Sequence, residues 1–550
     1  MKKILLSLTI VAAGLFSACT EYLDMTPTDS VSDKVMWETT ETAEYAVNYL
    51  YTYLWDIVSG QSAAGWTEAF TDQLKYGNYN YNANCFIPSE IAYGGSTLTA
   101  GYVDTYLGQW SFLYQGIMKV NQGLYNLKNY GMMPDEDKPR LEAEMRLIRG
   151  NMYFELMKRY KEVILYDWDI TKYEKNKALS SEADGWEFIY QDFKYAADNL
   201  PAKADAAGRL DKGAAYAFLT RSMLYAERWQ DVVDAYTEIK DLGYSLEKNY
   251  ADATGKSVVA GNTEAILQYL FDKDNQTHSM STYYAPGGDW VLQGKTLGGY
   301  GTPTQEMVES YEYATTGGFP DWSKWHGSTT ETPPYAELEP RFHATILYNG
   351  ADWKGRKIEP YVGGTDGWCQ WNKEQAHTGR TTTGYYLRKL VDETHVDLNL
   401  PDVNPITIIR YAEVLLNAAE AYCRLENTAG ANALVKEIRS RVGLPYTDKS
   451  GDALFAAIRQ ERRVELAFEG LWYWDLRRWN VAASNYPEGL NNYQVHGLKI
   501  EKTGEDEYIY TYVSVDDKDR NFPERMVDRF PLPQSELDNN ADVNQFTEWN

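Results

Sequence analysis

The sequence predicts a mainly α-helical protein with a loop-rich irregular lobe and small β-hairpins. Apolar residues recur at helical spacing in two separate blocks of the chain. Between the blocks, Gly, Pro, Trp and Tyr dominate and no regular period is present. Near the C-terminus, "HGLKIEKTGEDEYIYTYVSV" alternates at period two around a Gly-Glu-Asp turn, which predicts a hairpin.

The first helical block contains one long helix followed by a helical hairpin. The long helix is expected to end near Tyr160, and its apolar positions recur at steps of four and three: Leu141, Met145, Ile148, Met152 and Leu156. The stretch "GAAYAFLTRSMLYAERWQDVVDAYTEIKDLG" then predicts two helices with a break at Glu227-Arg228. The second helix has an apolar face made of Trp229, Val232, Val233 and Tyr236.

The second helical block, "ITIIRYAEVLLNAAEAYCRLENTAGANALVKEIRSRVG", repeats this design. A turn is expected from Asn427 to Gly430, and the second helix has the apolar face Ala431, Leu434, Val435, Ile438 and Val442. Both blocks resemble tetratricopeptide-type helix pairs. Because a single pair cannot bury its apolar face, several pairs must stack.

The N-terminus predicts export and a lipid anchor. Lys2 and Lys3 precede an apolar segment, 4–16, that is too short to span a membrane. Phe16-Ser17-Ala18-Cys19 resembles a lipobox, so residues 1–18 are expected to be removed and Cys19 acylated; the alternative is a plain secreted protein. Two or three acyl chains anchor a protein firmly. Glu21 and Asp24 resemble the signal that sends lipoproteins to the cell surface in Bacteroidetes-type bacteria.

Composition narrows the function classes. The formal net charge of −26 disfavours nucleic acid and anionic lipid as partners. The internal cysteines, Cys85, Cys369 and Cys423, are odd in number and lack CxxC spacing, so neither a disulfide framework nor a thiolate metal site is indicated. The chain has 45 Tyr and 17 Trp against 16 Phe, a preference for rings with a polar group that suits half-wet surfaces.

The motif "AIRQERRVELAFEGLWYWDLRRW" places Glu461, Glu465 and Glu469 at four-residue steps, on one face of a helix. Such a row could hold a pair of catalytic carboxylates. A general acid needs a raised pKa, however, and neighbouring guanidinium groups lower the pKa of a carboxyl. We therefore interpret the motif as structural ion pairing with the arginines of the same motif: Arg459, Arg462, Arg463, Arg477 and Arg478. Its tryptophans, Trp472, Trp474 and Trp479, are expected in the core.

No cofactor or metal is predicted. "ATGKS" at 253–257 lacks the first glycine of a phosphate-binding loop, and neither HExxH nor GxSxG occurs. Asp272, Asp274 and Asn275 offer oxygens but lack the glycine and glutamate that complete an EF-hand, so a solvated loop is expected.

A series of motifs, in order along nearly the whole chain, resembles the SusD/RagB family of outer-membrane nutrient-binding lipoproteins. The motifs are the lipobox, "AEMRLIRGNMYFELMKRY", "GGYGTPTQEMVESYEY", "EPRFHATILYNGADWKG", "TGYYLRKLVDE", "YAEVLLNAAEAY", "ERRVELAFEGLWYWDLRRW" and "FPLPQSELDNN". The resemblance implies a tetratricopeptide-like helical superhelix with an irregular lobe, which sits as a lid on a SusC-like TonB-dependent transporter. It also implies capture of polysaccharide or oligosaccharide without catalysis.

The expected organisation is a signal peptide at 1–18 and a single SusD-like domain at 19–550. Within that domain we expect a helical scaffold at about 35–271 and 401–480, a loop-rich ligand-binding insertion at about 272–400, and a C-terminal hairpin and tail at 481–550.

In the family the ligand site is built by an early loop and the mid-chain insertion, which correspond here to 66–86 and 283–325. Sugar rings have apolar C–H faces edged by hydroxyls, so the site needs exposed aromatic platforms beside polar groups. The predicted platforms are Trp66, Trp290, Trp322 and Trp325, supported by Tyr81, Tyr283 and Tyr284. The predicted hydrogen-bonding partners are Asp72, Asn78, Asn80 and Asp289.

Two alternatives stay open at this stage. An enzyme would need a pair of carboxylates free of arginine, for which Asp289 and Asp321 are the candidates. A RagB-like peptide-binding lipoprotein would share the scaffold but would favour backbone-pairing grooves over spaced platforms.

Overall fold

The computed structural model describes residues 33–54, 67–76, 83–95, 98–370 and 380–550. The N-terminal residues on which the export and anchor predictions depend, Cys19 included, lie outside these ranges, as do four predicted ligand-binding residues: Trp66, Asn78, Asn80 and Tyr81. The predictions for them remain predictions.

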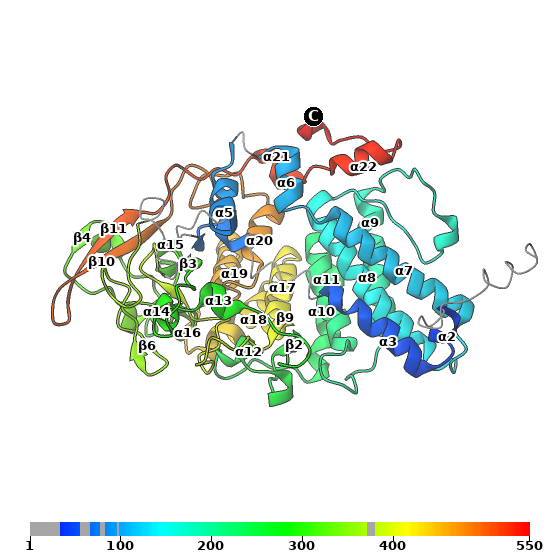
Figure 1. Cartoon of the computed structure of the whole chain (residues 1–550), viewed down its shortest axis with the longest axis horizontal. Helices are drawn as coiled ribbons and strands as arrows, with labels where there is room; N and C mark the ends of the chain where they lie inside the picture. The colour runs from blue at the N-terminus through cyan, green and yellow to red at the C-terminus, as the bar shows by residue number, and fades with distance from the viewer. Residues whose placement is uncertain (1–32, 55–66, 77–82, 96–97, 371–379) are drawn as a thin grey trace, which may run out of the picture.

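Long helices fill the half of the molecule at the right of Figure 1. The helix predicted to end near Tyr160 is α8 (Lys138–Tyr160), and its predicted apolar face is buried. The predicted hairpin is α10 (Lys212–Tyr225) and α11 (Trp229–Ile239), separated near Glu227, whose φ is 55°. The other helices of the N-terminal part are α2 (Asp33–Met36), α3 (Thr40–Leu50), α5 (Ala83–Tyr93), α6 (Ala100–Tyr106), α7 (Trp110–Tyr130) and α9 (Glu182–Asn199).

The second helical block lies beside the first. It contains α17 (Tyr411–Arg424), α18 (Thr428–Arg441), α19 (Gly451–Glu465) and α20 (Trp472–Arg478). The predicted turn is confirmed: the side chain of Asn427 accepts a hydrogen bond from the Gly430 amide at 3.0 Å and caps α18. Helix α17 packs against both α10 and α11, so the hairpins stack as expected.

One boundary was predicted wrongly. Residues 406–410, expected to open the second helical block, form strand β9 (Ile406–Arg410), which pairs antiparallel with β2 (Ala265–Tyr269). Four of these five residues are β-branched, and such side chains favour strands over helices. The helix begins only at Tyr411, whose amide donates to the Glu264 carbonyl.

The described residues of 272–400 contain only short elements, as the loss of periodicity predicts. The helices are α13 (Met280–Tyr284), α14 (Gly287–Val291), α15 (Gln305–Val308) and α16 (Pro340–Thr345), with α12 (Asp252–Gly255) just before them. The strands are β3 (Gly301–Pro303), β4 (Ser328–Thr329), β5 (Ile346–Leu347), β6 (Asp352–Trp353), β7 (Arg356–Lys357) and β8 (Tyr386–Leu387). Antiparallel pairs β5–β8 and β6–β7 brace this lobe internally.

The predicted C-terminal hairpin is confirmed as β10 (His496–Gly504) and β11 (Glu507–Ser514), at the left end of the molecule in Figure 1. Strand β4 adds to its edge, with Tyr510 opposite Thr329. The tail that follows carries α21 (Glu524–Asp528) and α22 (Gln534–Asn539) back to the helical half. There the Phe530 amide donates to the Arg159 carbonyl at 2.8 Å.

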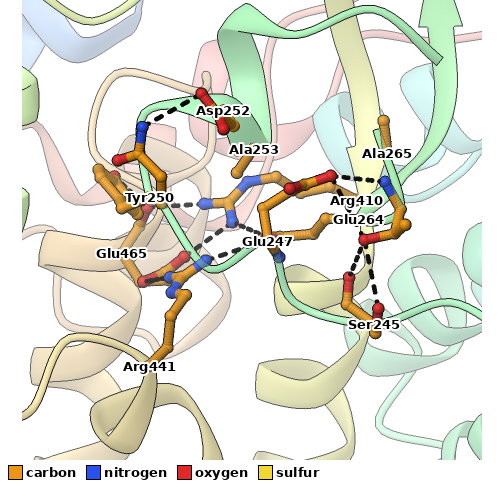
Figure 2. A network of polar contacts seen from close by, with 12 residues as sticks. Ser245, Glu247, Tyr250, Asp252, Ala253, Glu264, Ala265, Arg410, Arg441 and Glu465 are labelled. Carbon is orange, nitrogen blue, oxygen red and sulfur yellow. Dashed lines mark hydrogen bonds and ion pairs between the residues drawn. The ribbon is translucent and has the colours of Figure 1, made fainter. Parts of the chain in front are cut away.

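The charged motif lies in a buried ion network that joins the lobe to the scaffold (Figure 2). The Glu465 carboxylate is fully buried and accepts from Arg410 at 2.7 Å, from Arg341 at 3.3 Å and from Arg441. These three guanidinium groups hold the pKa of Glu465 well below its usual range despite the desolvation that opposes them. The prediction of structural ion pairing is therefore confirmed for Glu465.

Two details of that prediction were wrong. Helix α19 ends at Glu465, so Glu469 lies beyond it and pairs with Lys389 and Arg410, each at 2.6 Å. The arginines of the motif find other carboxylates: Arg459 pairs with Glu488, Arg462 with Asp475, Arg463 with Asp72 and Arg478 with Glu420. The partners of Glu465 come instead from α16, β9 and α18, which are distant in sequence.

The tryptophans of the motif follow the prediction in part. Trp472 and Trp474 are buried, whereas Trp479 is half-buried. None of the helices in the described ranges is both long and apolar enough to span a membrane.

Candidate functional site

The early segment and the mid-chain insertion meet, as the resemblance implies. Strand β1 (Leu74–Tyr76) pairs antiparallel with β3, and Tyr76 lies opposite Gly301. The rings of Tyr76 and Tyr284 meet edge to face at 6.4 Å, with their hydroxyls in hydrogen-bond contact. The pairing fixes the early segment against the lobe.

Trp290 is not an exposed platform. Its side chain is 2% exposed, and its indole N–H donates to the Ser281 carbonyl at 3.0 Å. Gly298, with a φ of 79°, lies directly over it: a Cβ added there would be 2.9 Å from the indole Cδ1. The ring anchors two loops, so the prediction that Trp290 is a platform was wrong.

Two further predicted platform residues are buried. Tyr284 has no exposed surface, and Trp322 is 5% exposed. In both cases neighbouring aromatic rings cover the side chain: Tyr76 lies against Tyr284, and Trp325 meets Trp322 edge to face at 5.5 Å. Tyr283 and Trp325 are half-buried and stay candidates for ligand contact.

The predicted hydrogen-bonding partners in the described chain are also buried. Asp72 pairs with Arg463 at 2.7 Å. Asp289 pairs with Arg356 at 2.6 Å and accepts from the Trp353 indole N–H at 2.8 Å. Both carboxylates hold loops in place instead of facing solvent, so neither fits the predicted role.

The pair of carboxylates that an enzyme would need does not fit catalysis. Asp289 is held by arginine, and Asp321 is exposed, where hydrogen bonds from the Ser323 side chain and amide lower its pKa. A general acid requires the opposite shift. Nor do the described residues contain a group of three His, Cys, Asp or Glu side chains placed to hold a metal ion.

A set of stacked rings that the sequence reasoning missed lies beside Trp325. The Tyr512 ring stacks on His496 with centroids 4.2 Å apart and an interplanar angle of 12°. The His326 ring also lies against Tyr512, with ring centroids 4.6 Å apart and an interplanar angle of 31°. The side chains of His326 and His496 are 43% and 25% exposed. We call His326, Tyr512 and His496 the aromatic column.

Two carboxylates flank the column. Glu309 contacts His326 Nε2 at 2.8 Å, and Glu306 contacts His496 Nδ1 at 2.7 Å. Burial raises the pKa of Glu306, and burial together with the charges of Glu306 and Glu309 raises the pKa of Tyr512. Partly exposed rings, His326 and His496, beside a partly exposed acceptor, Glu309, are the combination that the C–H faces and hydroxyls of a sugar require.

A signal for this column was present in the sequence. Tyr508, Tyr510 and Tyr512 alternate in the predicted hairpin, which places all three on one face of the strand. Tyr510 is buried, and Tyr512 is half-buried at the edge of the lobe. The contact of Tyr512 with the two histidines depends on tertiary packing and has no local signature.

Stacked helical hairpins that carry a loop-rich aromatic lobe define the SusD-like class of proteins. The chain belongs to the SusD family: residues 263–549 match the sequence model described as SusD family. Residues 21–224 match a second model, described as starch-binding associating with outer membrane.

Individual relatives agree with this assignment. A SusD-like protein of Bacteroides ovatus is 25% identical over 492 residues, which cover 87% of this chain and 83% of that protein. The crystal structure of a SusD-like protein from Bacteroides fragilis matches with a TM-score of 0.78 at 26% identity, over 95% of this chain and 99% of that one. A SusD-like carbohydrate binding protein from the same species matches with a TM-score of 0.74 at 24% identity, over 92% and 100%, and shares the fold.

Proposed function

We propose that the protein captures polysaccharide or oligosaccharide at the cell surface and delivers it to a SusC-like TonB-dependent outer-membrane transporter. Membership of the SusD family supports this proposal, as does the matched model described as starch-binding associating with outer membrane. The structural observation that carries it is the aromatic column beside Trp325, flanked by Glu306 and Glu309.

The chemistry of the column suits capture. When a ligand covers the apolar surface of an accessible ring, the removal of that surface from water contributes roughly 25 cal/mol of free energy per Å². Glu309, whose side chain is 23% exposed, accepts hydrogen bonds from sugar hydroxyls, which fixes the orientation of the sugar on the platform, whereas the buried Glu306 holds His496 in place. Because a polymer engages several such contacts at once, long chains bind more tightly than short ones. Binding of this kind needs no catalytic group and no cofactor.

The membrane part of the proposal depends on Cys19. Acylation of this residue would attach the protein to the outer membrane, in reach of the transporter. The strongly acidic chain disfavours nucleic acid as a partner.

Retardation in native gels tests the ligand class. The chain from residue 20 onward, purified without its anchor, is run through gels that contain starch or one of a panel of other polysaccharides, with gels that contain a protein hydrolysate as the control. We expect retardation by at least one polysaccharide and none by the hydrolysate. Retardation by the hydrolysate alone would overturn glycan capture in favour of peptide capture of the RagB kind.

A further inference from the structure

A tyrosine-lined cavity lies in the helical half, far along the chain from the lobe. It opens between α7, the segment 164–174 and α22, which lie together at the upper right of Figure 1. Its volume is about 280 Å³, just below the roughly 300–1,000 Å³ of sites for drug-sized ligands. Tyr114, Tyr166 and Tyr173 form much of the wall, and Glu174 and Glu536 supply the only charged groups of the lining. The size suits one small group.

Two of the three tyrosine rings, Tyr114 and Tyr173, are held in place by their own hydroxyls. Tyr114 donates to the Ile164 carbonyl at 3.0 Å and accepts from the Ile164 amide at 2.7 Å. Tyr173 donates to the Asp167 carbonyl at 2.6 Å and accepts from the Asn121 side chain at 2.7 Å. With these hydroxyls occupied, it is the rings that are left to meet a ligand.

The three rings pack against one another and line the same cavity. Tyr166 and Tyr173 lie with centroids 4.7 Å apart, and Tyr114 stands nearly perpendicular to Tyr166, at 6.1 Å and 86°. Because the rings differ in orientation, they line the cavity at different angles. A cation in the cavity is attracted by any ring face that lines it.

Glu536 adds a negative charge that no basic side chain balances. Its two oxygens accept from neutral donors, the Trp110 indole N–H at 3.1 Å and the Asn540 amide at 2.8 Å. Across the described ranges, no Lys, Arg or His nitrogen lies within 4.0 Å of Glu536 or Glu174. Burial raises the pKa of Tyr114 and Tyr166 in the cavity lining, and the negative charge of Glu536 raises both further.

We propose that this cavity binds an organic ammonium group. The rings supply cation–π attraction, Glu536 and Glu174 supply the counter-charge, and the apolar remainder of the wall accommodates the carbon skeleton that carries the cation. Tyr166 already attracts one ammonium of the chain itself: Lys177 Nζ lies 5.0 Å from its ring centroid, held by the Leu165 carbonyl and outside the cavity lining. The ammonium would come from an amino sugar or from a lysine side chain of a partner protein.

Calorimetry with the purified chain from residue 20 onward tests the site. The cationic probes are n-butylammonium chloride, glucosamine and the methylamide of Nα-acetyl-lysine; the neutral probes are n-butanol and glucose. We expect the cations to bind at least tenfold more tightly than their neutral counterparts. Glucosamine as the tighter cation would identify an amino sugar as the source, and the lysine derivative a protein partner.

Three variants locate the binding. Glu536→Gln should weaken the binding of the cationic probes at least tenfold, because a charge-assisted contact is lost. Tyr166→Leu removes one aromatic ring of the lining without changing the charge. It should weaken the binding of the cationic probes several-fold, which keeps the test informative if Glu536→Gln does not fold. Asp538→Asn removes a carboxylate from the same helix outside the cavity lining and should change nothing. Equal affinity for n-butylammonium and n-butanol, no binding of any cation, or undiminished binding in a folded Tyr166→Leu variant would overturn the proposal.

Discussion

Replacing Glu465 by Gln probes the ion network that joins the lobe to the scaffold. The substitution keeps the shape of the side chain and removes one negative charge from contact with Arg341, Arg410 and Arg441. All four side chains are essentially without solvent exposure, so water cannot replace the lost charge. Breaking a buried pair in this way costs about 3–5 kcal/mol of unfolding free energy.

The matched control is Glu488→Gln. Glu488 also pairs with an arginine, Arg459, but its side chain is 59% exposed. Exposed pairs contribute about 0–1 kcal/mol. Thermal unfolding followed by circular dichroism at pH 7 should therefore show a clear loss of melting temperature for Glu465→Gln and almost none for the control.

The pH dependence gives a second check of the same network. Because the pKa of Glu465 is depressed in the folded protein, its contribution is complete above the usual value near 4.5 and disappears only as the pH falls through the depressed value. The gap between wild type and Glu465→Gln should thus stay constant from pH 8 to pH 5 and narrow in stronger acid. Equal melting temperatures for Glu465→Gln and Glu488→Gln at pH 7 would refute the assignment of a stabilising network.

Three further predictions use single substitutions. Trp290→Ala should cost about 3–5 kcal/mol of stability because a buried ring is lost, whereas Trp325→Ala, at a half-buried position, should cost distinctly less; denaturant unfolding compares them. Burial raises the pKa of Glu68 to about 7, so the stability it contributes is present below about pH 4.5 and is lost as the pH rises through 7. Glu68→Gln should remove that slope and raise the melting temperature at pH 8, and an unchanged slope in the variant would contradict the assignment. Cys19→Ala should move the protein from the membrane to the soluble fraction, and membrane retention of that variant would count against the anchor.

Much of the helical half could be predicted from the sequence because helix periodicity is a local property. Local sequence signals predict each of three features: the buried face of α8, the break before α11 and the cap at Asn427. In each case the signal lies within a few residues of the feature. Strand β9 shows the limit of this reasoning. Its apolar residues could join a helix as easily as a strand by periodicity alone, and the pairing with β2 decides the outcome.

The candidate site was predicted less well because exposure is a tertiary property. The local sequence around a Trp in a Gly-rich loop does not distinguish an exposed ring from a covered one. Trp290 is covered by Gly298, which the fold places over its ring. The aromatic column likewise joins His326, which directly follows the short 3-10 helix Trp322–Trp325, to Tyr512 of β11 and His496 of β10. The composition of the loops did indicate that the lobe would hold many aromatic residues, and the family resemblance implied that the early segment would meet it.

Glycan capture at the aromatic column is tested most directly by a double variant, Trp325→Ala with His326→Ala. Both side chains are at least partly exposed, so the folded protein should survive the change, and a melting curve verifies this. Titration calorimetry then compares the variant and the wild type with the polysaccharide that retards the wild type in gels. We expect the folded double variant to lose most of its affinity for this polymer. Undiminished affinity in a folded double variant would contradict it.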